Sequence, residues 1–187
     1  MFTFYKKHNN QLYNKLTELS RNKFFYEKIK LADKFETRIL LIFFHLSIIL
    51  KICKKSDLKK KSQEIFDNIF QNIEYHIREL GHGDVSVNKN MKNLSKIFYD
   101  ILYNVDQDNI EAEIGKNLLK KYFFTNNKNE NEKIVNLLEY FKKFRNFCFD
   151  FSHSLLLIFP LLLTLRHVML SPCVYLMPYK LIDVALF

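Results

Sequence analysis

The sequence predicts an all-α protein: a single compact bundle of about six helices with an apolar C-terminal tail. Only three Gly and three Pro occur among 187 residues, whereas a β-sandwich or barrel needs frequent turn residues. Hydrophobic residues make up 48% of the chain and recur every three or four positions over much of its length, which is the helical period. We therefore expect one helical domain over residues 10–150 and a distinct tail over residues 151–187.

Two helices are predicted in the first third of the chain. Three leucines spaced three or four residues apart favour a helix from about Asn10 to Arg21, and an aromatic run follows at residues 24–26. The stretch from Arg38 to Cys53 is apolar almost all round, as in a buried central helix. Its apolar run is shorter than the ~20 residues that cross a bilayer. The polar residues from Ser56 to Ser62 indicate a linker.

The next two helices have clear amphipathic periods. One is expected from Gln63 to Leu80, ended by Gly81 in the left-handed conformation that residues with side chains resist. The other has Asp84 or Ser86 available as its N-cap. Their apolar positions are Phe66, Ile69, Phe70, Ile73, Ile77 and Leu80 in the first helix and Met91, Leu94, Phe98, Ile101 and Val105 in the second.

Two more helices are predicted before the tail. The first covers Ile110 to Tyr122, with apolar side chains aligned on one face. The polar residues from Thr125 to Glu132 indicate a solvent loop. An apolar stripe from Ile134 to Cys148 predicts the last helix of the bundle.

The net charge of +9 raises the question of a nucleic-acid or membrane-surface partner. Only five of the 29 basic residues are Arg, and the lysines are scattered apart from the short cluster Lys59–Lys61. A protein that reads bases favours Arg and a concentrated basic stripe. We therefore expect no DNA partner, and we rank phospholipid head groups or a ribosome surface above RNA as charge-driven partners.

The cysteines and the N-terminus indicate a reducing compartment. Cys53, Cys148 and Cys173 are odd in number and far apart, so neither a disulfide framework nor a zinc cluster is predicted. The first residues lack the apolar core of a signal peptide, and they contain no Arg before Arg21, unlike a mitochondrial presequence. A bacterial cytosolic origin fits these features best.

Two of the three glycines lie in the short motif GHGD, residues 81–84. A phosphate-binding loop needs more glycines, a Gly-Lys-Ser/Thr or a third Gly, and a preceding strand, all of which are missing here. A metal site from His76, His82 and Asp84 would meet no recurrent ligand spacing. The motif is therefore interpreted as a corner between two helices.

No catalytic, cofactor-binding or metal-binding residues are predicted. His45 lies on an apolar helix, where a lone His is more often a hydrogen-bonded core residue than a catalyst, and no nucleophile motif accompanies it. Arg38 is expected to form an internal pair with Asp33 or Glu36. The sequence thus favours a binding protein over an enzyme.

Residues 62–100, SQEIFDNIFQNIEYHIRELGHGDVSVNKNMKNLSKIFYD, carry a many-position pattern. It consists of Ser-Gln, Phe-Asp and a spaced Phe, then Arg-Glu-Leu-Gly-x-Gly-Asp, Val-x-Lys-x-x-Lys and a closing Phe-Tyr. This pattern closely resembles the central signature of the ubiquinol–cytochrome c chaperone family. The upstream segment FFYEKIKLADKFETRILLIFFHLSIILK is similar to the family's entry segment, and the resemblance extends over roughly residues 24–124.

The entry segment departs from the family pattern at two points. The usual Gly before Arg is Thr37, and the usual Leu-His pair is Phe44-His45. The residues that match the family or are expected to contact a partner are Asp33, Arg38, His45, Phe66, Phe70, Arg78, Glu79, Gly81, Gly83, Asp84, Val87, Lys89, Lys92, Phe98 and Tyr99. The charged members near the glycines form either an internal lock for the corner or a partner-recognition patch.

The resemblance implies an all-α assembly chaperone without catalysis. Its client would be newly made cytochrome b during biogenesis of the ubiquinol–cytochrome c reductase complex (complex III), with a ribosome or a small co-chaperone as a further partner. The expected location is cytoplasmic, peripheral to or anchored in the inner membrane of a bacterium. A membrane-anchored helical adaptor and, more weakly, an RNA-binding helical module are the alternatives.

The tail contains the apolar run LLLIFPLLLTL at residues 155–165. Extending it to the ~20 residues of a bilayer span brings in His153 or Arg166, and a mid-depth Arg costs ~2.5–3.5 kcal/mol. Membrane association, by one anchor or a shallow insertion, is the favoured interpretation. The alternatives are that the tail packs back on the bundle or is not native coding sequence.

Overall fold

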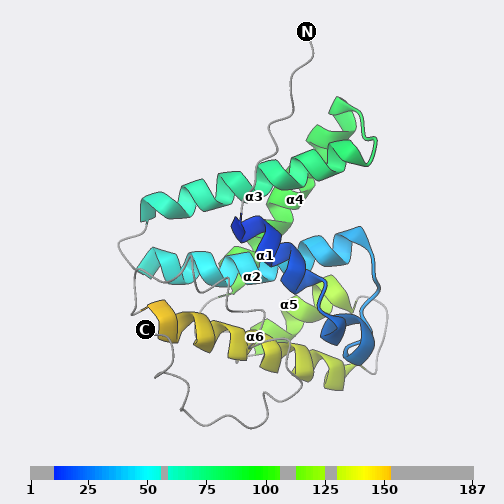
Figure 1. Ribbon diagram of the computed structural model, residues 1–187. Coiled ribbons are helices and arrows are strands. Elements are labelled where there is room, and N and C mark those ends of the chain that lie inside the picture. Colours follow the sequence, from blue (N-terminus) through cyan, green and yellow to red (C-terminus); the bar gives the residue numbers. More distant parts are fainter. Residues whose placement is uncertain (1–10, 56–58, 106–112, 125–129, 153–187) are drawn as a thin grey trace, which may run out of the picture.

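The computed structural model describes residues 11–55, 59–105, 113–124 and 130–152. These residues form helices, with no strand among them, so the predicted all-α bundle is confirmed (Figure 1). A short π-helical turn, η1, covers Phe24–Lys28. The six α-helices are α1 (Gln11–Ser20), α2 (Phe35–Lys55), α3 (Lys59–Glu79), α4 (Asp84–Asn104), α5 (Glu113–Phe123) and α6 (Asn131–Ser152).

Helix α2 is the central helix of the bundle. Helices α1, α3, α4 and α6 all contact it, and Figure 1 shows it crossing the middle of the molecule between α3 and α6. Every residue from Leu41 to Leu50 is buried, which explains why this sequence is apolar on all faces. The prediction of a buried central helix is therefore confirmed.

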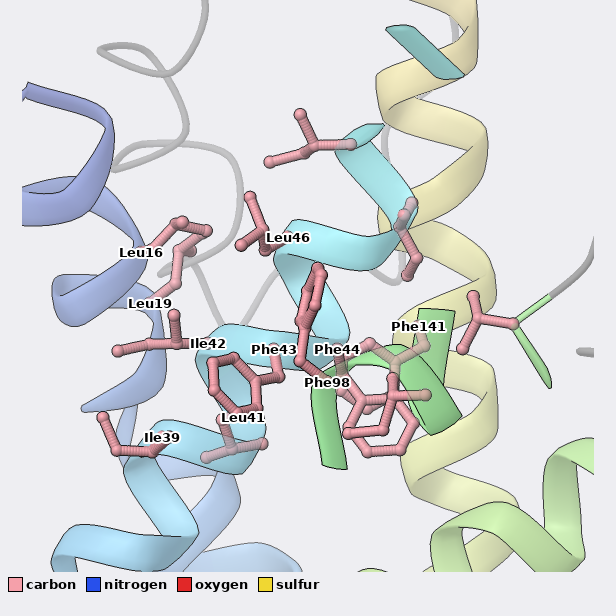
Figure 2. Close-up of a cluster of buried hydrophobic side chains, with 14 of the residues drawn as sticks. Leu16, Leu19, Ile39, Leu41, Ile42, Phe43, Phe44, Leu46, Phe98 and Phe141 are labelled. Atoms are coloured by element: carbon pink, nitrogen blue, oxygen red, sulfur yellow. The ribbon is translucent and has the colours of Figure 1, made fainter. Parts of the chain in front are cut away.

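The core is built from aliphatic and aromatic side chains that converge on α2. Figure 2 shows leucines of α1 facing one side of α2, and aromatic rings of α4 and α6 meeting those of α2. The ring of Phe43 lies 5.3 Å from that of Phe98, and the ring of Phe44 lies 5.2 Å from that of Phe141. Such aromatic pairs add to the stabilisation that burial of apolar surface provides.

Helix α3 begins earlier than the sequence predicts. The linker expected from Ser56 to Ser62 was too long, because α3 already begins at Lys59. Lysine is a good helix former, so a polar run of this composition extends an amphipathic helix by one turn. Residues 56–58, between α2 and α3, lie outside the described residues.

The prediction that Asp84 or Ser86 caps α4 was wrong. Gly83 is the N-cap, with φ −71° and ψ 162°, and no side chain caps the helix. Asp84 is the first helical residue, and its carboxylate pairs with Arg78 instead. An acid in the first turn still interacts favourably with the helix dipole.

The tail was expected over residues 151–187, of which residues 151 and 152 belong to α6. The remaining residues, 153–187, and the expected membrane association lie outside the described part of the chain. Within the described ranges, no helix combines the length and the apolar character that crossing a membrane requires.

Candidate functional site

An apolar groove of about 700 Å³ lies among α2, α3 and α4. It contains residues from three segments that are distant in sequence. These are Leu50 and Lys51 of α2, Ser62, Gln63 and Phe66 of α3, and Phe98, Tyr99, Leu102 and Tyr103 of α4. The groove therefore lies at the open end of the α3–α4 hairpin, where α3 starts and α4 ends.

The aromatic residues of the family-like pattern build the wall of this groove. The ring of Phe66 lies 4.3 Å from that of Phe70, 5.4 Å from that of Phe98 and 5.8 Å from that of Tyr99. Phe70 in turn stacks on Phe43 of α2, with the ring centroids 5.5 Å apart. These contacts hold the rings on packed helices, which gives the groove a rigid apolar wall.

The outer side of the groove consists of two exposed tyrosines. Tyr99 is 55% exposed and Tyr103 is 82% exposed, one helical turn apart on α4. Among the described lining residues, Lys51 is the one that carries a charge, and none of them is an acid. A tyrosine offers an apolar ring and a polar hydroxyl, which suits a surface that binds an apolar partner from water.

The GHGD corner lies at the opposite, closed end of the same hairpin. Gly81 has φ +86°, the left-handed conformation that the sequence predicted. Helix α3 ends at Glu79, one residue before the expected Leu80, so Leu80 lies between the helix and Gly81. The amide of Gly81 donates to the carbonyl of Arg78, and the amide of Val87 donates to that of Gly83. The interpretation of GHGD as a helix–helix corner is confirmed.

Arg78 joins the two sides of this corner through ion pairs with Glu74 and Asp84. Its guanidinium donates to the carboxylate of Glu74, with Nε at 3.0 Å and Nη2 at 2.8 Å, and also pairs with Asp84 across the turn. The two acids raise the pKa of Arg78. The Arg78–Asp84 pair is the contact that the internal-lock interpretation of the corner predicts.

The remaining family-like residues at the corner differ in exposure. Val87 is completely buried, and Glu79 makes only a 3.9 Å contact with His76. Lys89 and Lys92 are exposed and contact no acid in the described parts of the chain. The two lysines are therefore available to a partner.

Asp33, Arg38 and His45 do not reach the groove. Arg38 donates two hydrogen bonds to Asp33, of 2.9 Å from Nε and 2.6 Å from Nη2. Of the two acids considered, Asp33 is therefore the partner of Arg38, and this pair ties the start of α2 to the segment before it.

His45 is a hydrogen-bonded core residue, as predicted. Its Nδ1 donates to the carbonyl of Leu41 at 2.6 Å, so its Nε2 accepts from the hydroxyl of Tyr140 on α6 at 2.9 Å. Burial lowers the pKa of His45 to about 4. The neutral, fully buried imidazole thus joins α2 to α6.

The described residues provide no cluster of three or more His, Cys, Asp or Glu that could hold a metal ion. His76 hydrogen-bonds with the Tyr13 hydroxyl at 2.7 Å, whereas His82 lies near the Ser86 hydroxyl at 3.1 Å. The two imidazoles considered as ligands therefore have separate partners.

Six of the described groove residues were not among the candidate site residues predicted from the sequence: Leu50, Lys51, Ser62, Gln63, Leu102 and Tyr103. Tyr103 carried a detectable signal, because it is an aromatic residue one turn from Tyr99 and off the apolar stripe of its helix. Leu50 and Lys51 of α2 carried no such signal, because their helix is apolar on almost every side and its period does not mark one face.

The fold and the groove define a class: an all-α bundle that displays an aromatic, apolar groove on its surface. The sequence model of the ubiquinol-cytochrome C chaperone family matches residues 27–153, and the chain belongs to this family. The resemblance seen in the sequence is thereby confirmed, and the match extends into α6, beyond the predicted limit near residue 124.

The fold is similar to the crystal structure of the Cbp3 homolog from Brucella abortus. The two proteins share 25% sequence identity with a TM-score of 0.67, over 78% of this chain and 82% of that one. No curated protein matches the sequence.

Proposed function

We propose that this protein is an assembly chaperone of the ubiquinol–cytochrome c reductase complex that binds newly made cytochrome b. Membership of the ubiquinol-cytochrome C chaperone family supports a client in the assembly of that complex. Cytochrome b is the client that the family resemblance implies, and its membrane helices present apolar side chains before they are packed. The chaperone would meet this client at the membrane surface.

The groove among α2, α3 and α4 is the proposed client site. The observation that carries this assignment is that Phe66, Phe98 and Tyr99, which belong to the family-like pattern, line an apolar groove. A volume of about 700 Å³ accommodates several apolar side chains of a bound helix. The described lining residues include no acid, so an apolar client would not bury a negative charge against them.

The corner at the closed end of the hairpin is the second contact surface of the proposed chaperone. Leu80 is 60% exposed and Val85 is 86% exposed, and the exposed Lys89 and Lys92 follow on the same helix as Val85. Apolar residues beside lysines suit a partner with a mixed apolar and acidic surface. A co-chaperone or a ribosomal component would bind here.

The client site is tested by capture of cytochrome b from native membranes with the tagged full-length chain. Tyr103→Glu places a charge in the groove at an exposed position, so we expect the fold to be retained and capture to fall several-fold. Val135→Glu is the matched control, because Val135 is 50% exposed and lies on α6 away from the groove lining. Equal capture by both variants would exclude the groove as the client site.

A further inference from the structure

The groove leaves aromatic surface in contact with water when no client is present. Tyr103 and Tyr99 are exposed there, and Phe66 is only partly buried. Exposed apolar surface costs roughly 25 cal/mol per Å², so a covering segment stabilises the protein. Contiguous apolar surface of this kind usually has a partner.

The chain itself contains a segment of matching chemistry. Residues 153–187 include the run LLLIFPLLLTL at 155–165 and have only three charged side chains, Arg166, Lys180 and Asp183. Leucine, isoleucine and phenylalanine side chains are what an apolar aromatic groove binds best. The tail is thus similar in composition to the membrane helix of a client.

The tail leaves the bundle near the groove. Figure 1 shows the C-terminal end of α6 beside the C-terminal end of α2, the helix that contributes Leu50 and Lys51 to the groove. Burial and, to a smaller extent, the nearby Cys53 thiol raise the pKa of Cys148 to about 12, which agrees with the last turns of α6 lying against this part of α2. The 35 residues after Ser152 reach up to about 115 Å when extended.

We propose that the tail, residues 153–187, occupies the groove among α2, α3 and α4 whenever no client is bound. The tail begins within reach of the groove, and its covalent attachment to the bundle raises its effective concentration there. It covers the groove in the free protein, and a client must displace it. Displacement of the tail by a client rests on the proposed function, whereas occupation of the groove by the tail does not.

The test places a photo-crosslinking amino acid, p-benzoylphenylalanine, at position 103 of the full-length chain. We expect irradiation of the purified protein to join position 103 to a peptide within residues 153–187 of the same molecule, as identified by mass spectrometry. Position 85 is the matched control: Val85 is equally exposed, on the same helix, but at the closed end of the hairpin. It should give no crosslink to the tail.

A tail variant provides the second measurement. Ile158→Asp combined with Leu162→Asp introduces two charges into the apolar run, outside the described core, and should lower the crosslink from position 103 several-fold. Circular dichroism checks that the helical content is unchanged. A crosslink whose yield does not change would overturn the proposal, because it would not depend on the apolar character of the tail.

Three further outcomes would overturn the proposal. Crosslinks between two chains would assign the groove to a second copy, and crosslinks to lipid in phosphatidylglycerol vesicles, with none to the tail before vesicles are added, would assign it to the membrane. Absence of any crosslink from position 103 would leave the groove open to water. None of these results measures cytochrome b capture, so a failure here and a failure of the proposed function are distinguishable.

Discussion

At the scale of single residues, the two glycines of GHGD have different conformations. Gly81 has φ +86°, a region that L-residues rarely adopt, whereas Gly83 has φ −71° and serves as the N-cap of α4. A Cβ atom at either position would meet no atom within 4 Å. The backbone angle alone therefore distinguishes them, and a pair of identical substitutions separates this effect from packing.

Gly81→Ser should destabilise the protein by about 1 kcal/mol, because a side chain disfavours the left-handed region. Gly83→Ser should be neutral or stabilise it by a few tenths of a kcal/mol, since Ser is a preferred N-cap residue. Urea unfolding of both variants measures the difference. Equal free energies of unfolding would contradict the left-handed conformation of Gly81.

His45 makes stability depend on pH between about 4 and 6.5. Burial lowers its pKa to about 4 in the folded protein, compared with about 6.5 in the unfolded chain. The unfolded chain therefore binds a proton first as the pH falls. The contribution of His45 to the free energy of unfolding is fully present above about pH 6.5 and is lost progressively as the pH falls toward 4.

We expect the free energy of unfolding to drop by about 1 kcal/mol between pH 7.5 and pH 5.5 because of His45. His45→Gln removes the titrating group and retains an amide that can bond to Leu41 and Tyr140. Urea unfolding at the two pH values, for both proteins, gives the His45 contribution. If the variant keeps the full pH dependence, His45 is not its source.

At the scale of elements, the α3–α4 hairpin carries two separate surfaces, one at each end. The open end forms the apolar groove, and the closed end forms the charged corner. Arg78 fixes the angle of the corner by joining Glu74 on α3 to Asp84 on α4. The lysines further along α4 have no such internal partner in the described residues.

Variants of the corner should therefore separate stability from partner binding. Arg78→Gln removes both ion pairs and should lower the melting temperature. Lys89→Glu combined with Lys92→Glu should change the free energy of unfolding by less than ~0.5 kcal/mol, because both side chains are exposed. The same double variant should abolish binding of the co-chaperone or ribosomal component that we propose for the corner, and it should leave capture of cytochrome b by the groove unchanged. Loss of the fold in the lysine variant would instead make these charges structural.

At the scale of the whole molecule, all six α-helices contribute to the described core. The buried cluster draws on side chains from Leu12 to Phe144 and includes members from α1, α2, α3, α4, α5 and α6. Residues 10–150 are thus expected to behave as one cooperative unit.

Removal of residues 153–187 should leave a folded bundle with one cooperative thermal transition. Circular dichroism should give the helical content of the described helices, and the melting temperature should change by only a few degrees. A truncated chain that lacks a cooperative transition would show that the tail is part of the core. The double tail variant Ile158→Asp with Leu162→Asp is the full-length control.

The sequence by itself determined the helical class, the buried central helix, the Gly81 corner and the core role of His45. Each of these depends on local information: the period of apolar side chains, the conformational preference of glycine, or the composition around one residue. The family-like pattern between residues 62 and 100 belongs to the same category, because it lies within one contiguous hairpin.

Only the tertiary structure decided which faces meet. It joined His45 to Tyr140 across 95 positions, and it brought Leu50 of α2 beside Phe66 of α3 and Tyr103 of α4. A helical period shows which face of a helix is apolar, but it does not give the partner helix or the angle at which the two helices cross. The groove exists only where three such helices meet, so no segment of the sequence contains it.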